Sequence, residues 1–345
     1  MRTPQLLLTS LLSLLTLHAL AQNAPDSTSL LKDLTVNIHG TVRGKFEYQP
    51  DQDNARFEVR NARVSLTGNI TPNVGYKAEI DLSDEGSIKM LDAYGRIIGT
   101  RHPWNLTIGQ MRVPFTIDTH RSPHQQYFAN RSFLAKQVGN VRDVGISFQF
   151  KTRTQNPLTI QVGMFNGSGL TNQKNYWTKH FNYTAKFTLN ANDYTYVLSY
   201  QKTHPDIVDI HMVNFGLFRH TSNFHAEIEY LLKFYAHDAF SPVNTFDVFA
   251  CYNIHTPRLR TIKKISPLAR WDFMSDHSNG TADDNGELII NDYMRHRLTL
   301  GFTMSLSTPF TADVRCNYEQ YFYGDDAIIG TSDHNKLVVE LMVHF

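Results

Sequence analysis

The sequence predicts an all-β fold, a sixteen-stranded antiparallel barrel that crosses a membrane with its strands. Three observations carry this prediction: apolar and polar residues alternate with a period of two, the strand-like segments are even in number, and their connections alternate between short and long. Mean hydropathy is -0.35, and Lys+Arg 33 nearly balance Asp+Glu 32. This charge balance argues against a nucleic-acid-binding protein with a basic patch.

The N-terminus has the pattern of a secretory signal peptide. A positive residue, Arg2, precedes an apolar run over residues 6–17, and residues 19–21 form a small-x-small cleavage pattern. The run is shorter than the roughly 20 apolar residues that a membrane-spanning helix needs. We therefore expect cleavage after Ala21, which removes the signal peptide 1–21.

The last predicted strand shows the alternation most clearly. Leu337, Val339 and Leu341 fall on one face, whereas Lys336 and Glu340 fall on the other. An apolar face and a wet face suit a barrel wall between lipid and water. The same pattern places strands near residues 34–48, 56–69, 73–83, 88–99, 103–112, 143–152, 157–165, 179–190, 193–203, 208–219, 222–235, 243–255, 261–274, 291–306, 309–323 and 334–345.

The connections between these strands distinguish two ends of the barrel. Short links at 71–72, 190–192 and 307–308 alternate with longer ones, among them 166–178 and 275–290. Outer-membrane barrels have short periplasmic turns and longer extracellular loops. We therefore expect residues 22–33 to form a periplasmic segment and residues 34–345 to form the barrel. Phe345, the final residue, resembles the C-terminal signature that such barrels present to their assembly machinery.

One connection, residues 113–142, is about thirty residues long and shows little alternation. A long insert of this kind usually has a functional reason. It is the third loop at the long-loop end, and wide barrels enclose channels that an inward loop can narrow. We therefore predict that it folds into the lumen as a constriction. It carries a surplus of positive charge, from Arg121, Arg131, Lys136 and Arg142 against Asp118.

Six short segments occur in a recognisable order: 64–68 (VSLTG), 76–81 (YKAEID), 92–94 (DAY), 109–115 (GQMRVPF), 130–132 (NRS) and 142–145 (RDVG). Together they resemble the phosphate-selective porin O and P family. The resemblance implies a homotrimeric sixteen-stranded channel that passes anions in series, with Arg112, Arg131 and Arg142 on the matching positions. Asn130 departs from the pattern, which more often has an acidic residue there.

We therefore expect a bacterial outer-membrane porin, a passive diffusion channel that prefers small anions such as phosphate. Arginine suits such anions because its planar fork donates two hydrogen bonds, and rings of Arg or Lys favour anions electrostatically. We expect no cofactor, no metal and no catalysed reaction; the expected partners are membrane lipid and small anions. The predicted anion pathway comprises Arg112, Arg121, Arg131, Lys136, Arg142, Arg43, Lys45, Arg60, Arg63 and Lys77.

Several alternatives stay open. The predicted wall also carries inward carboxylates, so each lumen arginine could instead pair across strands. An outer-membrane barrel hydrolase would need Ser and His within hydrogen-bond reach, and no G-x-S-x-G or HExxH motif is present. A plugged structural or adhesive barrel would not conduct. Residues 281–292 are spaced like a calcium loop but lack its flanking helices.

Overall fold

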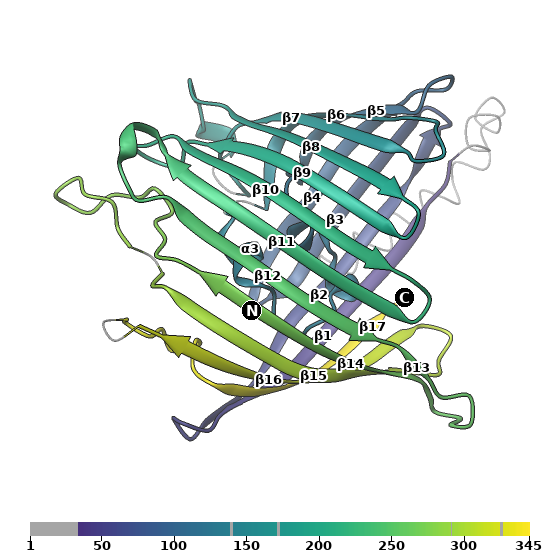
Figure 1. Ribbon diagram of the computed structural model, residues 1–345. Coiled ribbons are helices and arrows are strands. Elements are labelled where there is room, and N and C mark those ends of the chain that lie inside the picture. Colours follow the sequence, from purple (N-terminus) through teal and green to yellow (C-terminus); the bar gives the residue numbers. More distant parts are fainter. Residues whose placement is uncertain (1–33, 139–140, 171–172, 291, 325–326) are drawn as a thin grey trace, which may run out of the picture.

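The computed structural model describes residues 34–345 except 139–140, 171–172, 291 and 325–326 (Figure 1). The predicted signal peptide 1–21 and periplasmic segment 22–33 lie outside the described residues. Within the described part of the chain, no helix is both long and apolar enough to span a bilayer.

The strands form one closed antiparallel sheet, in which each strand pairs with its neighbours in sequence and β1 also pairs with β17. The two-residue β13 and the preceding β12 both pair with β14, so they are consecutive pieces of one strand interrupted at Asn253. The described residues therefore form sixteen strands around the barrel, which confirms the predicted fold class. The strands are β1 (Asn37–Gln49), β2 (Asn54–Thr71), β3 (Val74–Asp84), β4 (Ser87–Ile98), β5 (Trp104–Arg112), β6 (Arg142–Lys151), β7 (Leu158–Phe165), β8 (Asn182–Ala191), β9 (Tyr194–Thr203), β10 (Ile210–His220), β11 (Phe224–Tyr235), β12 (Val243–Tyr252), β13 (Ile254–His255), β14 (Ile262–Met274), β15 (Arg295–Leu306), β16 (Thr311–Tyr323) and β17 (Lys336–His344).

The barrel wall is apolar outside and polar inside. On β17, Leu341 is 50% exposed, whereas Glu340 beside it is fully buried and Lys336 is nearly so. Exposed leucines and buried charges invert the distribution of a soluble protein. This inversion is what the alternation predicts for strands between lipid and a polar lumen.

A β-bulge in β2 places more charge in the lumen than simple alternation allows. Arg43 lies opposite Asn61, but the next residue of β1, Gly44, lies opposite Val59, so Arg60 is the extra residue. The bulge shifts the inward face of β2 from even to odd positions. Glu58, Arg60 and Arg63 therefore all line the same cavity.

The two ends of the chain close the barrel where β1 meets β17. Phe345 and Gly40 exchange two backbone hydrogen bonds, of 2.9 and 3.1 Å. The Phe345 ring lies over Gly40, and a Cβ atom there would be 2.1 Å from the ring. Gly40 is thus a position of close approach at the seam.

We expect Gly40→Ala to lower the resistance of the barrel to heat and denaturant, because the added methyl group displaces the Phe345 ring. Overpacking of this kind costs about 1–3 kcal/mol. Gly44→Ala on the same strand is the matched control, because its Cβ meets no atom within 4 Å. Thermal unfolding in detergent measures the difference, and equal melting temperatures for the two variants would contradict the expectation.

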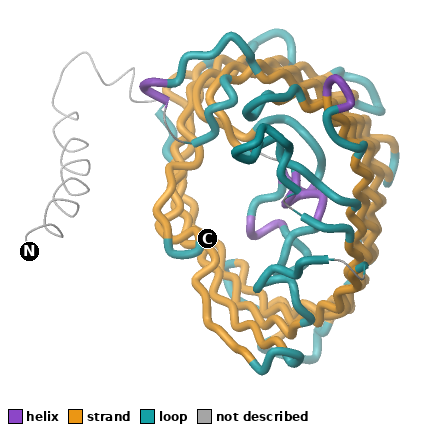
Figure 2. Tube along the Cα trace, turned by 90° about the vertical axis from the view of Figure 1, so that its left-hand side faces the viewer, coloured by secondary structure: helices purple, strands orange, loops and turns teal. Residues whose placement is uncertain are grey.

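The third connection at the long-loop end, between β5 and β6, lies inside the ring of strands (Figure 2). It contains the short helix α3 (Phe133–Gln137). The described residues also form four single 3-10 turns: η2 (Asp118–His120), η3 (Pro123–Gln125), η4 (Gln173–Asn175) and η5 (Ala236–Asp238). We call residues 113–141 the inward segment. Arg142, predicted as the end of this loop, is instead the first residue of β6.

The inward segment packs mainly on the side of the wall formed by β8 to β16, while Arg43 of β1 donates to its Gln126 at 2.8 Å. The backbone N–H groups of Ile117 and Asp118 donate to the Glu229 carboxylate on β11, at 2.6 and 3.2 Å. The N–H of Ala129 donates to Asn317 on β16 at 2.9 Å. Apolar side chains reinforce these bonds: Phe115, Leu134 and Val138 pack with Met212 and Leu231 of the wall in a buried cluster. This packing places the segment inside the lumen, against these strands (Figure 2).

Candidate solute pathway

Three neighbouring cavities lie between the inward segment and strands β17 and β1 to β7. The outer cavity has a volume of about 360 Å³ and reaches the end of the barrel that carries the long loops. The periplasmic cavity, about 230 Å³, reaches the end where His39 and His344 lie. A side cavity of about 260 Å³ extends along β3 to β7. Arg63 lines both the outer and the periplasmic cavity, and Lys77 lines both the periplasmic and the side cavity.

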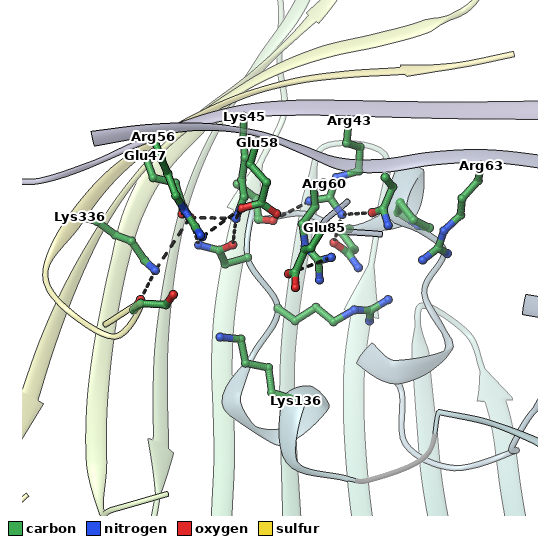
Figure 3. Close-up of a pocket in the computed structure, with 17 residues that line it drawn as sticks. Arg43, Lys45, Glu47, Arg56, Glu58, Arg60, Arg63, Glu85, Lys136 and Lys336 are labelled. Atoms are coloured by element: carbon green, nitrogen blue, oxygen red, sulfur yellow. Dashed lines mark hydrogen bonds and ion pairs between the residues drawn. The ribbon is translucent and has the colours of Figure 1, made fainter. Parts of the chain in front are cut away.

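The outer cavity is strongly basic. Its lining contains eight lysines and arginines against three glutamates, a formal surplus of five positive charges. Figure 3 shows these side chains gathered between β1, β2 and the inward segment. The basic residues are Arg43, Lys45, Arg56, Arg60, Arg63, Arg131, Lys136 and Lys336, and the acidic ones are Glu47, Glu58 and Glu85.

Part of this charge is neutralised within the wall. The Lys45 ammonium lies 2.9 Å from Glu47 and 3.3 Å from Glu58. Arg43 donates to Glu340 from Nε at 2.8 Å and also to the backbone carbonyl of Ala129. The three glutamates neutralise part of the positive charge, and the bond to Ala129 ties Arg43 to the inward segment. The unneutralised positive charge belongs to other residues.

The inward segment supplies cations with little neutralisation. The Lys136 ammonium makes no hydrogen bond or ion pair with any residue that the structure describes. The Arg131 guanidinium donates to the backbone carbonyls of Asp118 and Arg121, at 2.5 and 2.9 Å, and lies 4.0 Å from the Asp118 carboxylate. Neutral carbonyls orient the guanidinium without cancelling its charge. Lys136 and Arg131 therefore carry the electrostatic surplus of the outer cavity.

The protein around the lumen changes the acidity of both side chains, of which Arg131 is half-buried and Lys136 is exposed to the lumen. It lowers the pKa of Lys136 to about 8, with Asp333 favouring and Arg297 opposing the charged form. It lowers the pKa of Arg131 to about 10. Both groups are positive at neutral pH, but Lys136 loses its charge in mildly alkaline solution.

Arg63 and Lys77 continue the basic lining past the inward segment. Arg63 Nε donates to Asp81 at 2.7 Å. The Lys77 ammonium lies 2.7 Å from both Glu79 and Asp92. These two cations are more fully neutralised than Lys136, so the positive field is strongest in the outer cavity and declines toward the periplasmic end.

Arg112, at the end of β5, lines the side cavity. Its Nη1 donates to the backbone carbonyls of Thr119 and His120, at 3.3 and 2.6 Å. The guanidinium thus fixes the start of the inward segment while it borders the cavity.

Two predicted pathway residues, Arg121 and Arg142, line none of these three cavities. Arg121 forms two hydrogen bonds with the Glu227 carboxylate, one of them at 2.9 Å, and its guanidinium lies over the Tyr127 ring at 5.2 Å. Arg142 donates to Asp92 at 2.7 Å. Both are held in ion pairs and anchor the structure around the pathway.

The structure also adds basic residues that the predicted site lacked. Arg56 and Lys336 line the outer cavity, and Arg96 lines the side cavity. Arg56 lies directly opposite the inward Glu47 in the β1–β2 pair. The strand register, counted from the short turn between β1 and β2, could therefore have identified Arg56 as an inward residue.

Residues 281–292 form a turn stabilised by its own side chain. The Asp283 carboxylate accepts backbone N–H bonds from Asn285 and Glu287, both at 2.9 Å. Asp283 is therefore bonded within the turn, whereas Asp292 pairs with Arg295 at 2.9 Å.

The sequence matches the family model for phosphate-selective porin O and P over residues 33–188, in agreement with the resemblance seen in the sequence. No curated protein matches the chain.

Among solved structures, trimeric OmpT of Vibrio cholerae aligns with a TM-score of 0.61 at 11% identity, covering 90% of this chain and 99% of that one. An anion-selective porin from Comamonas acidovorans gives 0.60 at 10% identity, with 90% and 99% covered. The DcaP channel of Acinetobacter baumannii gives 0.59 at 14% identity, with 91% and 98% covered. At such identities the likeness concerns the fold alone.

Proposed function

The chain is an outer-membrane porin related to the phosphate-selective porin O and P family through residues 33–188, and we propose that it conducts small anions along the basic side of its lumen. The observation that carries the proposal is the surplus of five positive charges around the outer cavity. A cleft with charge of one sign and low-dielectric walls concentrates counter-ions and raises their rate of entry.

The arrangement suggests how an anion crosses. Lys136 and Arg131 attract it into the outer cavity. There the lysine ammonium and the planar arginine guanidinium donate hydrogen bonds that replace part of the anion's hydration. Arg63 borders the passage to the periplasmic cavity, and Lys77 follows it. Arg63 and Lys77 are more fully neutralised by carboxylates, so the anion is bound less strongly as it advances. Conduction requires successive binding sites of this weak kind.

The pairing pattern favours general anion conduction over a tight phosphate site. A tight site would need several arginines free to donate bidentate hydrogen bonds to one ligand. In the outer cavity, Arg43, Arg56, Arg60 and Arg63 each already contact a carboxylate. Phosphate is therefore one of several anions that we expect to pass.

The similarities point to a channel rather than an enzyme. We propose that the chain catalyses no reaction. A sealed structural barrel would require the inward segment to fill the whole lumen, and the three cavities beside it argue against this. We also propose a homotrimer, for which the trimeric form of Vibrio cholerae OmpT is a precedent, although that likeness is one of fold.

The charge of Lys136 provides a pH test of the pathway. Lysine is positive below its pKa, so with a pKa of about 8 it is charged at pH 7 and mostly neutral at pH 9. We expect the preference for chloride over potassium to fall as the pH rises through about 8. Lys136→Gln should start at the lower preference and change little over this interval. A wild-type preference that stays constant from pH 7 to 9 would contradict a role for Lys136.

A further inference from the structure

A second group of side chains with ligand chemistry lies at the extracellular rim, away from the pathway. His180 ends the loop between β7 and β8, and His204 and Asp209 belong to the loop between β9 and β10. One ligand atom from each of the three lies within 4.8 Å of the other two. None of the three lines a pathway cavity.

Two contacts bring these side chains together. His204 Nδ1 lies 2.8 Å from Asp209 Oδ1. The His180 and His204 rings stack with their centroids 4.2 Å apart and their planes 16° from parallel. The stacking places the two imidazoles side by side, and a neutral imidazole is the form that binds metals.

The backbone around each histidine is held in place. The His204 N–H donates to the Asn182 side chain at 3.0 Å, and the His180 N–H donates to Thr178 Oγ1 at 2.8 Å. The Lys202 ammonium lies 3.0 Å from Asp209 Oδ2. Because Lys202 holds one carboxylate oxygen, the other remains directed at His204. Partners of this kind orient metal ligands in known sites.

We propose that His180, His204 and Asp209 bind a divalent transition-metal ion, of which Zn²⁺ is the reference case. Two imidazole nitrogens and one carboxylate oxygen form a three-ligand set that leaves a fourth position for water. Imidazole suits zinc, copper and nickel, whereas calcium and magnesium prefer oxygen ligands alone. His180 is exposed, so an ion from the external solution reaches the site directly.

The bound ion links two external loops. His180 lies two residues before β8, and the loop from His204 to Asp209 joins β9 to β10. This second loop also contacts the loop after β14, because Pro205 lies against Gly280, where a Cβ atom would be only 2.5 Å from its ring. The metal would therefore cross-link the extracellular rim on the side of the barrel that holds the inward segment.

The test is calorimetric titration of ZnCl₂ into the detergent-solubilised protein after removal of metals with a chelator. We expect one high-affinity ion per chain at pH 7.5, and a loss of affinity of at least tenfold in both His180→Ala and His204→Ala. His102→Ala is the matched control, because His102 is exposed on the turn between β4 and β5, at the opposite end of the barrel, and should leave binding unchanged.

A second measurement separates a site from surface adsorption. We expect Zn²⁺ to slow trypsin cleavage after Lys179 in the wild type and not in His204→Ala, since a cross-linked loop opens less often. At pH 5 both effects should vanish, because histidine ligands must be deprotonated. Equal affinity in wild type and His204→Ala, an equal loss in His102→Ala, or no binding at pH 7.5 would each overturn the proposal.

Discussion

Replacing Glu227 with alanine is expected to release part of the inward segment from the wall and to increase the single-channel conductance. Glu227 is fully buried and neutralises the Arg121 guanidinium of the segment through two hydrogen bonds. Removing one partner of a buried ion pair costs about 3–5 kcal/mol, because the remaining charge is left uncompensated. We expect the segment to move away from β11, because this movement takes the uncompensated charge out of its buried position. The movement widens the lumen and adds fluctuations to the current.

Asp193→Ala is the matched control for this change. Asp193 pairs with Arg219 at 3.7 Å on an exposed turn, and exposed pairs contribute about 0–1 kcal/mol. The double variant Arg121→Leu, Glu227→Leu removes both charges and should recover part of the wild-type conductance. Single-channel recordings in planar bilayers measure each variant. Unchanged conductance and current noise in Glu227→Ala would show that the ion pair does not hold the segment.

The second large effect is expected from Lys136→Glu, which should remove most of the preference for anions. The substitution lowers the surplus of the outer cavity by two charges, at an ammonium that forms no ion pair with the described residues. Two charge units at about 5 Å in water change the energy of an ion by about 1.7 kcal/mol, and salt reduces this figure. We therefore expect the chloride to potassium permeability ratio to fall several-fold.

Lys174→Glu makes the same charge change on an exposed external loop. Lys174 lines none of the three cavities, and salt screens exposed charges, so this control should change the ratio much less than Lys136→Glu. Zero-current potentials in a salt gradient give both ratios. If the two variants shift the ratio equally, the effect belongs to the general charge of the protein and not to the outer cavity.

The barrel could be predicted from the sequence because lipid and water impose a period of two on its strands, which bulges such as the one in β2 interrupt only locally. The strand count, the chain closure and the long connection follow from that period together with the lengths of the connections. The predicted connection asymmetry is incomplete, since the links between β1 and β2 and between β3 and β4 are short although they lie at the long-loop end.

The pairing of charges could not be predicted, because it depends on contacts between distant residues. Arg121 meets Glu227, 106 positions away, only because the inward segment packs on β11. The bulge at Arg60 likewise follows from the β1–β2 register and not from composition. The ten predicted cations therefore divide into eight that border the cavities and two, Arg121 and Arg142, that anchor the structure.

The central claim is that the basic side of the lumen makes this porin prefer anions. The most direct measurement is the zero-current potential of the purified wild-type protein in a planar bilayer across a KCl gradient at pH 7. We expect the sign that corresponds to chloride permeating faster than potassium. A potential of the opposite sign would contradict the claim and would place the selectivity with the lumen carboxylates, among them Glu79 and Asp81.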